Sequence, residues 1–307
     1  MNRNDVLLAA ERVAGHVERT PLIKSSLGWL KCECLQTGGS FKLRGATNRL
    51  LQLSEEERAR GVVAFSSGNH AQGTAIAAER LGIKATIVMP SNAPAIKVEG
   101  TRSHGAEIIF YDRLTESREE IAGRLAAERG SVVVPSFDDV MIVAGQGSAG
   151  IEILDQMPHP PERIVIPCGG GGLASGIALA CPDADIVIVE PEGWDDMRRS
   201  LAEDSIVPVE PGAPATLCDA LQTMIVSPIT FGILKEREAS ALYVSEEQVR
   251  DAVRWAWREH QLVVEPGGSV ALAAVLAGLV PSGEGTVMVL SGGNIDPAIH
   301  AEIVSEA

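Results

Sequence analysis

Basic residues are scarce in this chain. Its 307 residues include 26 Lys and Arg against 41 Asp and Glu, a formal net charge of −15. An acidic chain repels phosphate backbones and anionic lipids, so we expect neither nucleic acid nor a membrane surface as a partner. The apolar share of 45% and the charged share of 22% are typical of a globular protein with a sizeable core, which excludes general disorder.

Cysteine is also sparse, and its five positions are Cys32, Cys34, Cys168, Cys181 and Cys218. An odd number with one close pair does not indicate a disulfide framework, so we expect a reducing, cytoplasmic location. No second Cys/His pair accompanies the first two cysteines at zinc-ligand spacing. Long apolar runs are interrupted as well. We interpret residues 164–181, which contain four successive glycines, and residues 267–283 as buried elements, not membrane spans.

Short β-branched runs alternate with helical stretches along most of the chain. The first series has strands at 61–66, 84–89, 107–111 and 131–134, with helices at 70–81, 97–104 and 116–129. The second has strands at 163–167, 185–189 and 286–290, with helices at 173–180, 245–260 and 269–279. This alternation predicts an α/β fold with two doubly wound, parallel or mixed sheets, and the length fits about two domains.

The segment TGGSFKLRGA places Lys42 just after two glycines, a serine and a phenylalanine. The glycines allow close backbone approach, and Ser40 is suited to cap a helix that begins near Lys42. A lysine at such a turn could point into a cleft and form a Schiff base with a carbonyl compound. The alternative is a surface lysine that opens an amphipathic helix.

Two further strand-to-helix turns are suited to anions. SSGNHAQG, at 66–73, offers helix N-terminal N–H groups, hydroxyls and an amide, which suit a substrate carboxylate. PCGGGGLASG, at 167–176, leaves backbone N–H groups uncovered at a helix start, which suits a phosphate monoester. It lacks the Lys-Ser/Thr pair of a Walker loop. The alternatives are an ordinary capped turn and a flexible turn.

A fourth cluster, LSGGNID, follows the last expected strand and places Ser291 at the carboxyl end of that strand, where open α/β sheets bind ligands. SFKLRGA, SSGNHAQG, PCGGGGL and LSGGNID, in this order, resemble the pyridoxal-phosphate (PLP) enzymes of the tryptophan-synthase-β fold type. The chain is most similar to their serine/threonine dehydratase and serine racemase branch, from about residue 20 to 296.

The resemblance implies roles for individual residues. Lys42 would form the Schiff base with PLP, and Phe41 would lie against the cofactor ring. Asn69 would bond the ring 3′-oxygen, Ser291 would bond the pyridine nitrogen, and Glu265 would be the acidic residue near the cofactor. The phosphate would accept backbone N–H bonds from Gly169, Gly170, Gly171, Gly172 and Leu173. The substrate carboxylate would lie in the turn made by Ser66, Ser67, Gly68, Asn69 and His70.

The implied activity is that of an ammonia-lyase (dehydratase) that converts a β-hydroxy amino acid to a 2-oxo acid and ammonia. Threonine and serine are the leading substrates, and 3-hydroxyaspartate or another β-hydroxy amino acid is an alternative. A cofactor-free ligand-binding protein on the same fold is the alternative outside enzymes. We expect a large domain of residues 1–50 and 141–307, a small domain of residues 51–140 inserted in it, and a homodimer.

Three details leave the family pattern open. Many dehydratases have Ala where this chain has Ser67, and a hydroxyl there resembles serine racemases. Ser67 could reprotonate the α-carbon opposite Lys42, so racemisation is the second candidate activity. The segment ATLCDA resembles one that carries a structural cation, but Ala215 stands where a Glu is usual. Only Asp219 is kept, with Glu210 nearby, so a divalent cation stays undecided. The chain ends soon after LSGGNID, so we expect no C-terminal regulatory domain.

Overall fold

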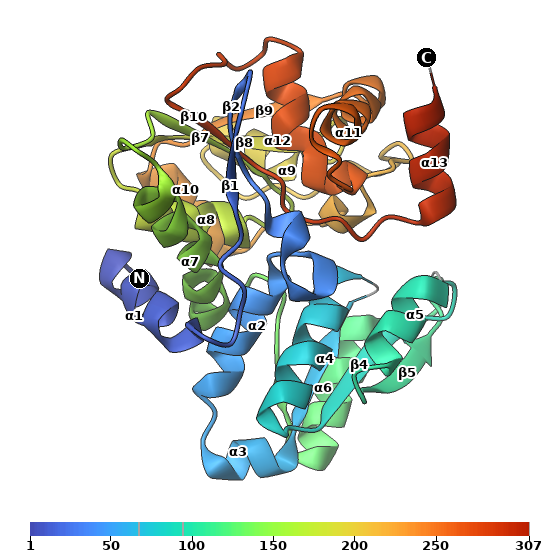
Figure 1. Ribbon diagram of the computed structural model, residues 1–307. Helices are drawn as coiled ribbons and strands as arrows, with labels where there is room; N and C mark the ends of the chain where they lie inside the picture. The colour runs from blue at the N-terminus through green and yellow to red at the C-terminus, as the bar shows by residue number, and fades with distance from the viewer. Residues whose placement is uncertain (67, 94, 307) are drawn as a thin grey trace.

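Two β-sheets covered by helices make up the chain (Figure 1). The computed structural model describes residues 1–66, 68–93 and 95–306. The strands are β1 (Leu22–Ser25), β2 (Gly28–Lys31), β3 (Val62–Phe65), β4 (Ala85–Pro90), β5 (Glu107–Tyr111), β6 (Val132–Val133), β7 (Arg163–Pro167), β8 (Asp185–Pro191), β9 (Ser240–Val244) and β10 (Thr286–Val289). The α-helices are α1 (Arg3–Val13), α2 (Lys42–Leu51), α3 (Glu55–Arg60), α4 (Asn69–Leu81), α5 (Ala95–Arg102), α6 (Arg118–Arg129), α7 (Val140–Gln156), α8 (Gly172–Ala180), α9 (Asp196–Ala202), α10 (Pro228–Glu236), α11 (Glu246–His260), α12 (Pro266–Leu276) and α13 (Pro297–Ser305). Short 3-10 turns are η1 (Glu33–Leu35), η2 (Thr37–Gly39) and η3 (Asp219–Leu221).

The larger sheet has six strands in the order β1-β2-β10-β7-β8-β9. β1 pairs antiparallel with β2, and the other four neighbouring pairs are parallel. β7 and β10 consist almost entirely of buried residues, as expected for parallel strands with helices on both faces. The last strand along the chain, β10, lies inside the sheet, where Val287 aligns with Trp29 on one side and Ile164 on the other.

The smaller sheet has four parallel strands in the order β5-β4-β3-β6. Its strands run from residue 62 to residue 133, between β2 and β7 of the larger sheet. Figure 1 shows it with α4, α5 and α6 in the lower part of the view, below the six-stranded sheet. The two sheets confirm the expected α/β class, and the domain boundaries at 51 and 140 stay a prediction.

Helices α2, α7 and α8 connect the two sheets. α2 packs against α4 on one side and against α7 on the other, and α7 packs along α8. A Cβ on Gly147 of α7 would lie 2.6 Å from the carbonyl oxygen of Gly176 in α8, so only glycine allows these helices to approach so closely. Helix α2, which begins at Lys42, therefore lies at the junction between the two sheets.

Among residues 1–66, 68–93 and 95–306, no helix is both long enough and apolar enough to cross a bilayer.

Candidate active site

One cavity of about 610 Å³ opens at the carboxyl ends of strands from both sheets. β3, β7 and β10 end at Phe65, Pro167 and Val289, and the loops that follow them line this cavity. The predicted site residues that line it are Phe41, Lys42, Ser66, Gly68, Asn69, His70, Gly169, Gly170, Gly171, Gly172, Leu173, Glu265 and Ser291. The prediction for Ser67 falls outside the described residues. The fold thus brings residues from 41 to 291 into one site.

Lys42 is the first residue of α2, and its side chain reaches into the cavity. Its Nζ donates a hydrogen bond to the carbonyl oxygen of Ser136 at 3.0 Å and lies 5.0 Å from the ring centroid of Phe41. Burial lowers the pKa of Lys42 to about 8, although the charge of Glu265 opposes the change. The amine is therefore less basic than an ordinary lysine, as a nucleophile or proton acceptor requires.

The expected helix cap at Ser40 was wrong. The N-cap residue of α2 is Phe41, and no side chain caps this helix. Ser40 is instead extended and forms an isolated antiparallel bridge with Gly292. This bridge holds the segment before Lys42 against the loop that carries Ser291. Ser40 therefore positions the two segments through its backbone and not through its side chain.

Asn69 and Glu265 form a buried pair beside Lys42. Asn69 Nδ2 donates to Glu265 Oε1 at 2.5 Å, and Asn294 Nδ2 donates to Asn69 Oδ1 at 2.8 Å. Glu265 Oε2 is buried and has no hydrogen-bond partner in the described part of the chain. Burial, reinforced by the charge of Asp219, raises the pKa of Glu265 to about 7. A carboxyl oxygen facing this cavity thus needs a polar partner that a bound group would supply.

The turn before α4 presents backbone donors. α4 begins at Asn69, and Gly68 precedes it without a side-chain cap, so the first N–H groups of the helix face the loop. His70 is buried, and its Nε2 lies 2.8 Å from the carbonyl oxygen of Val134. Burial and the charge of Lys42 lower the pKa of His70 to about 3, so its imidazole is neutral. The geometry suits a carboxylate held by backbone N–H groups.

The four glycines between β7 and α8 form a cradle that admits no side chains. A Cβ on Gly170 would lie 2.3 Å from the Phe137 ring, and a Cβ on Gly172 would lie 2.4 Å from Gln146 Oε1. Gly171 has a φ of 81°, a left-handed value that glycine adopts readily. The start of α8 therefore exposes backbone N–H groups to the cavity. With the unpaired Glu265 oxygen and the lysine amine, this donor set fits the phosphate, the polar ring atoms and the aldehyde of PLP.

The lining of the cavity includes an ion pair that no sequence motif indicated. Lys97 of α5 donates to Asp219 of η3, the residue considered above for a cation site. Glu210, the other residue considered there, pairs with Arg199 at 2.9 Å. Within residues 1–66, 68–93 and 95–306, no three His, Cys, Asp or Glu side chains gather closely enough to hold a metal ion.

Two buried carboxyls lie outside the cavity, Glu190 near the end of β8 and Asp196 at the start of α9. Glu190 accepts hydrogen bonds from the backbone N–H groups of Met197 and Arg198. Burial, followed by the charge of Asp196, raises the pKa of Glu190 well above its ordinary value. Burial also raises the pKa of Asp196 to about 7. Neither carboxyl oxygen of Asp196 has a hydrogen-bond partner within the part of the chain that the structure covers. No sequence motif singled out this pair.

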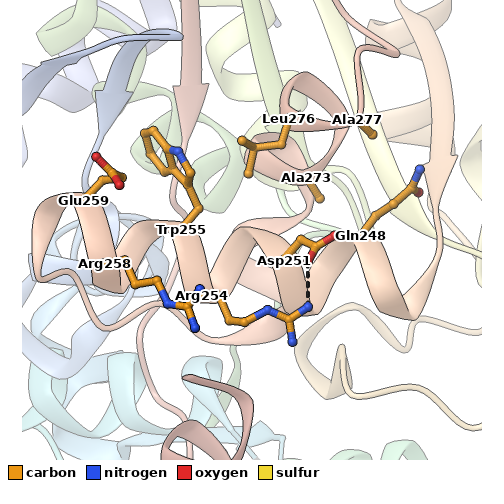
Figure 2. Close-up of a pocket in the computed structure, with 9 residues that line it drawn as sticks. All are labelled: Gln248, Asp251, Arg254, Trp255, Arg258, Glu259, Ala273, Leu276 and Ala277. Atoms are coloured by element: carbon orange, nitrogen blue, oxygen red, sulfur yellow. Dashed lines mark hydrogen bonds and ion pairs between the residues drawn. The ribbon is translucent and has the colours of Figure 1, made fainter. Parts of the chain in front are cut away.

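A second hollow, of about 400 Å³, lies between α11 and α12 (Figure 2). Its main cation, Arg254, pairs with Asp251 at 2.5 Å, with Glu247 at 3.0 Å and with Glu306 at 2.6 Å. Figure 2 shows the Asp251 pair as a dashed line. These carboxylates already compensate the charge of Arg254, and none of the predicted site residues lines this hollow.

Known proteins similar to this chain are consistent with a site for pyridoxal phosphate. Residues 13–292 match the family described as pyridoxal-phosphate dependent enzyme. An L-threo-3-hydroxyaspartate ammonia-lyase from Pseudomonas sp is 42% identical over 315 residues, with 98% of each chain covered. Maize serine racemase superposes with a TM-score of 0.92 at 34% identity, covering 98% of this chain and 96% of the racemase. A T.th. threonine deaminase superposes with a TM-score of 0.89 at 40% identity, covering 96% of this chain and 99% of the deaminase.

These similarities confirm the resemblance seen in the four motifs, including its dehydratase and racemase branch. Pyridoxal 5′-phosphate is accordingly the cofactor of this protein, and the cavity that contains Lys42 has the donors to hold it. The chain belongs to the family of pyridoxal-phosphate dependent enzymes.

Proposed function

We propose that this protein is a PLP-dependent ammonia-lyase that converts a β-hydroxy amino acid to a 2-oxo acid and ammonia. The observation that carries the proposal is the convergence of three features on one cavity. These are the amine of Lys42, the glycine cradle before α8, and the backbone donors of the turn before α4. They suit, in turn, proton transfer, a phosphate and a substrate carboxylate.

The residues that would hold the cofactor are those that the family resemblance implies, and all of them line this cavity. Backbone N–H groups of Gly169, Gly170, Gly171, Gly172 and Leu173 would bind its phosphate. Phe41 would lie against the ring, Asn69 would bond the ring oxygen, and Ser291 would bond the ring nitrogen. Glu265, paired with Asn69, would complete this polar edge. When bound to an amino acid, PLP withdraws electrons from the α-carbon and so makes the α-proton acidic.

Lys42 would then move the proton. With its pKa lowered to about 8, Nζ can accept the α-proton near neutral pH. The turn from Ser66 to His70 would hold the α-carboxylate, which fixes the α-carbon relative to Nζ. Ser291 has a neutral hydroxyl, which would not keep the pyridine nitrogen protonated, whereas a carboxylate in its place would. An unprotonated nitrogen would make the ring a weaker electron acceptor. Loss of the β-hydroxyl would therefore be favoured over a lasting build-up of negative charge on the ring.

The substrate side chain is the finer part of this proposal. Threonine and serine follow from the resemblance of the four motifs, and threonine deaminase is among the similar structures. The Pseudomonas relative is named for L-threo-3-hydroxyaspartate. Purified holoenzyme should release 2-oxo acid and ammonia from at least one of these three amino acids. Absence of 2-oxo acid from all three, with PLP bound, would refute the ammonia-lyase.

Racemisation is a second candidate activity, supported by the similarity to maize serine racemase and by the hydroxyl of Ser67. Lys42 can serve one face of a planar α-carbon, so inversion needs a proton carrier on the other. A positioned proton carrier contributes on the order of 100- to 10,000-fold in rate. Ser67→Ala should slow interconversion of D- and L-serine by roughly that factor in a chiral assay, with a much smaller effect on elimination. Racemisation that survives the substitution would exclude Ser67 as the second carrier.

We also infer that the protein forms a homodimer. Light scattering of the purified holoenzyme tests this directly, because it measures the mass of the assembly in solution.

A further inference from the structure

The ion pair between Lys97 and Asp219 joins two parts of the cavity wall. Lys97 belongs to α5, which covers the four-stranded sheet, whereas Asp219 belongs to η3 in the other part of the molecule. Both side chains line the cavity that contains Lys42. The pair therefore lies in the wall of the cavity that would receive the substrate.

The two partners differ in their exposure to water. The side chain of Lys97 is 11% exposed, whereas that of Asp219 is 50% exposed. A buried ammonium needs an anion beside it, because water cannot replace the lost hydration. A half-exposed carboxylate can return to water at little cost. Another anion can therefore replace Asp219, but some anion must stay next to Lys97.

Lys97 also lies close to the turn that would hold the α-carboxylate. A Cβ on Gly68 would lie 3.6 Å from Lys97 Nζ, which places the ammonium beside the turn that precedes α4. Lys97 and Asp219 also act in opposite directions on the pKa of Glu265, which neighbours Lys42. Both charges are thus within electrostatic range of the centre of the cavity.

We propose that Lys97 is a specificity-determining residue that binds the side-chain carboxylate of a β-hydroxy dicarboxylic amino acid, which takes the place of Asp219 in the ion pair. This inference rests on the proposed ammonia-lyase activity and names its substrate class. Serine and threonine bring no second carboxylate, so Asp219 stays on Lys97 when they bind. A 3-hydroxyaspartate supplies the anion itself and releases Asp219 to water.

Besides Lys42 and Lys97, two arginines line the cavity, Arg113 and Arg118. Arg118 is bonded to Glu119 at 2.8 Å and lies over the ring of Phe65, 5.5 Å from its centroid. Lys97 is the cation that the structure places against Gly68, which is why the role is assigned to it. Arg118→Met is the comparison variant that tests this choice.

The experiment compares kcat/KM for L-threo-3-hydroxyaspartate and L-threonine in Lys97→Met and Asp219→Asn holoenzymes. A charge-assisted hydrogen bond to the carboxylate predicts that Lys97→Met lowers the ratio of the two values by roughly 10- to 100-fold. Asp219→Asn should raise the ratio, because the competing carboxylate is gone. Lys97→Arg, which keeps the charge, should retain most of the wild-type ratio. Matched controls are Lys235→Met and Asp204→Asn, an exposed ion pair outside the cavity, which should not change it.

A binding measurement separates this inference from the proposed activity. Succinate has the same spacing between its carboxylates as 3-hydroxyaspartate, and butyrate lacks one of them. In calorimetric titrations of the holoenzyme, Lys97→Met should weaken the binding of succinate by roughly 10- to 100-fold relative to the binding of butyrate. If wild type releases no 2-oxo acid, the ammonia-lyase fails while the succinate titration still tests Lys97. If Lys97→Met and Asp219→Asn each lowered kcat/KM equally for L-threo-3-hydroxyaspartate and L-threonine, the ion pair would have only a structural role. That result would overturn the inference. The inference would also be overturned if Arg118→Met lowered the ratio of kcat/KM for the two substrates and Lys97→Met did not.

Discussion

At Lys42 the fold sets the basicity of a single amine. Burial lowers its pKa from 10.5 to about 8, and Glu265 limits the change. The unprotonated amine is the form that reacts with an aldehyde. Attachment of PLP to the apoprotein should therefore become faster as pH rises, with a midpoint near 8 and not near 10.5. Stopped-flow absorbance measures this rate.

The same residue gives a direct chemical test. Borohydride reduction of the holoenzyme, followed by peptide mapping, should place the pyridoxyl label on Lys42. Lys42→Ala should lower turnover by at least ~100-fold without unfolding the protein. The control is Lys84→Met, an exposed lysine, which should keep wild-type activity. A label on another lysine would contradict the assignment.

Asp196 gives a prediction for stability against pH. Burial raises its pKa from 3.8 to about 7, so the folded state favours the protonated form. This contribution is complete below the unfolded pKa near 4 and is lost as pH rises through about 7. Asp196→Asn, which stays neutral, should therefore exceed wild type in unfolding free energy by up to roughly 4 kcal/mol at pH 8. The difference should shrink as pH falls toward about 4.

Urea unfolding across this range, with a chelator present so that no cation pairs with the carboxyls, checks the trend. Asp183→Asn, on an exposed loop, is the control and should show no such pH dependence. A constant difference between about pH 4 and about pH 8 would mean that Asp196 is ionised throughout.

Single residues of the site differed in how far sequence could predict them. Lys42 and the four glycines stand in short motifs, where the residue types themselves carry the chemistry. Lys97 stands in an ordinary helix, 122 residues from Asp219, and only the fold joins them. Gln146, whose Oε1 lies against Gly172, was missed for the same reason. Contacts between distant segments leave no local pattern.

Among the elements, the turn between β7 and α8 is the proposed phosphate site. Gly170→Asp adds a side chain where a Cβ already meets Phe137 at 2.3 Å, and it adds negative charge beside a phosphate. PLP affinity should fall by at least ~100-fold, since roughly 3 kcal/mol or more of steric and electrostatic cost opposes binding. Equilibrium dialysis with PLP, read by absorbance, measures the loss.

Gly232→Asp is the matched control, because Gly232 lies on α10 and a Cβ there meets nothing within 4 Å. It should leave PLP affinity unchanged. Equal cofactor content in the two variants after dialysis would remove the glycine turn from the phosphate site.

Strands made of short β-branched runs were predictable. The strands at 107–111 and 163–167 match β5 and β7 residue for residue. The hairpin β1–β2 was missed because Lys31, a charged residue in a strand, is buried and breaks the apolar pattern. Helix α7 was missed because its glycines indicate a helix breaker in sequence. In the fold they allow α7 to pack closely against α8 and α2.

Across the whole molecule, a buried charge cluster fixes the helix of Lys42 to the six-stranded sheet. Arg44 of α2 bonds Glu33 at 2.7 Å and Glu152 of α7 at 2.6 Å, and Lys31 of β2 bonds Glu152 at 2.5 Å. Burial would raise the pKa of Glu33, but the charge and hydrogen bonds of Arg44 lower it below its ordinary value. Each charge in the cluster therefore depends on its partners.

Arg44→Met should lower the free energy of unfolding by about 3–5 kcal/mol, because it leaves Glu33 buried without its main partner and removes one of the two cations paired with Glu152. Thermal and urea unfolding measure the loss. Adding Glu33→Gln should recover part of it, since one uncompensated charge is removed. Arg19→Met breaks an exposed pair with Asp155 and should cost no more than about 1 kcal/mol. Equal losses in the buried and the exposed variant would contradict the role of the cluster.

The interior position of β10 determines the order in which a nascent chain can be completed. The four-stranded sheet has all its strands once residue 133 has left the ribosome. β2 and β7 must wait for residues 286–289, and until then each presents an open edge to solvent or to chaperones. Ser291 and the loop that bridges to Ser40 emerge later still. Because Ser291 belongs to the proposed cofactor site, we expect cofactor loading to follow synthesis of nearly the entire polypeptide.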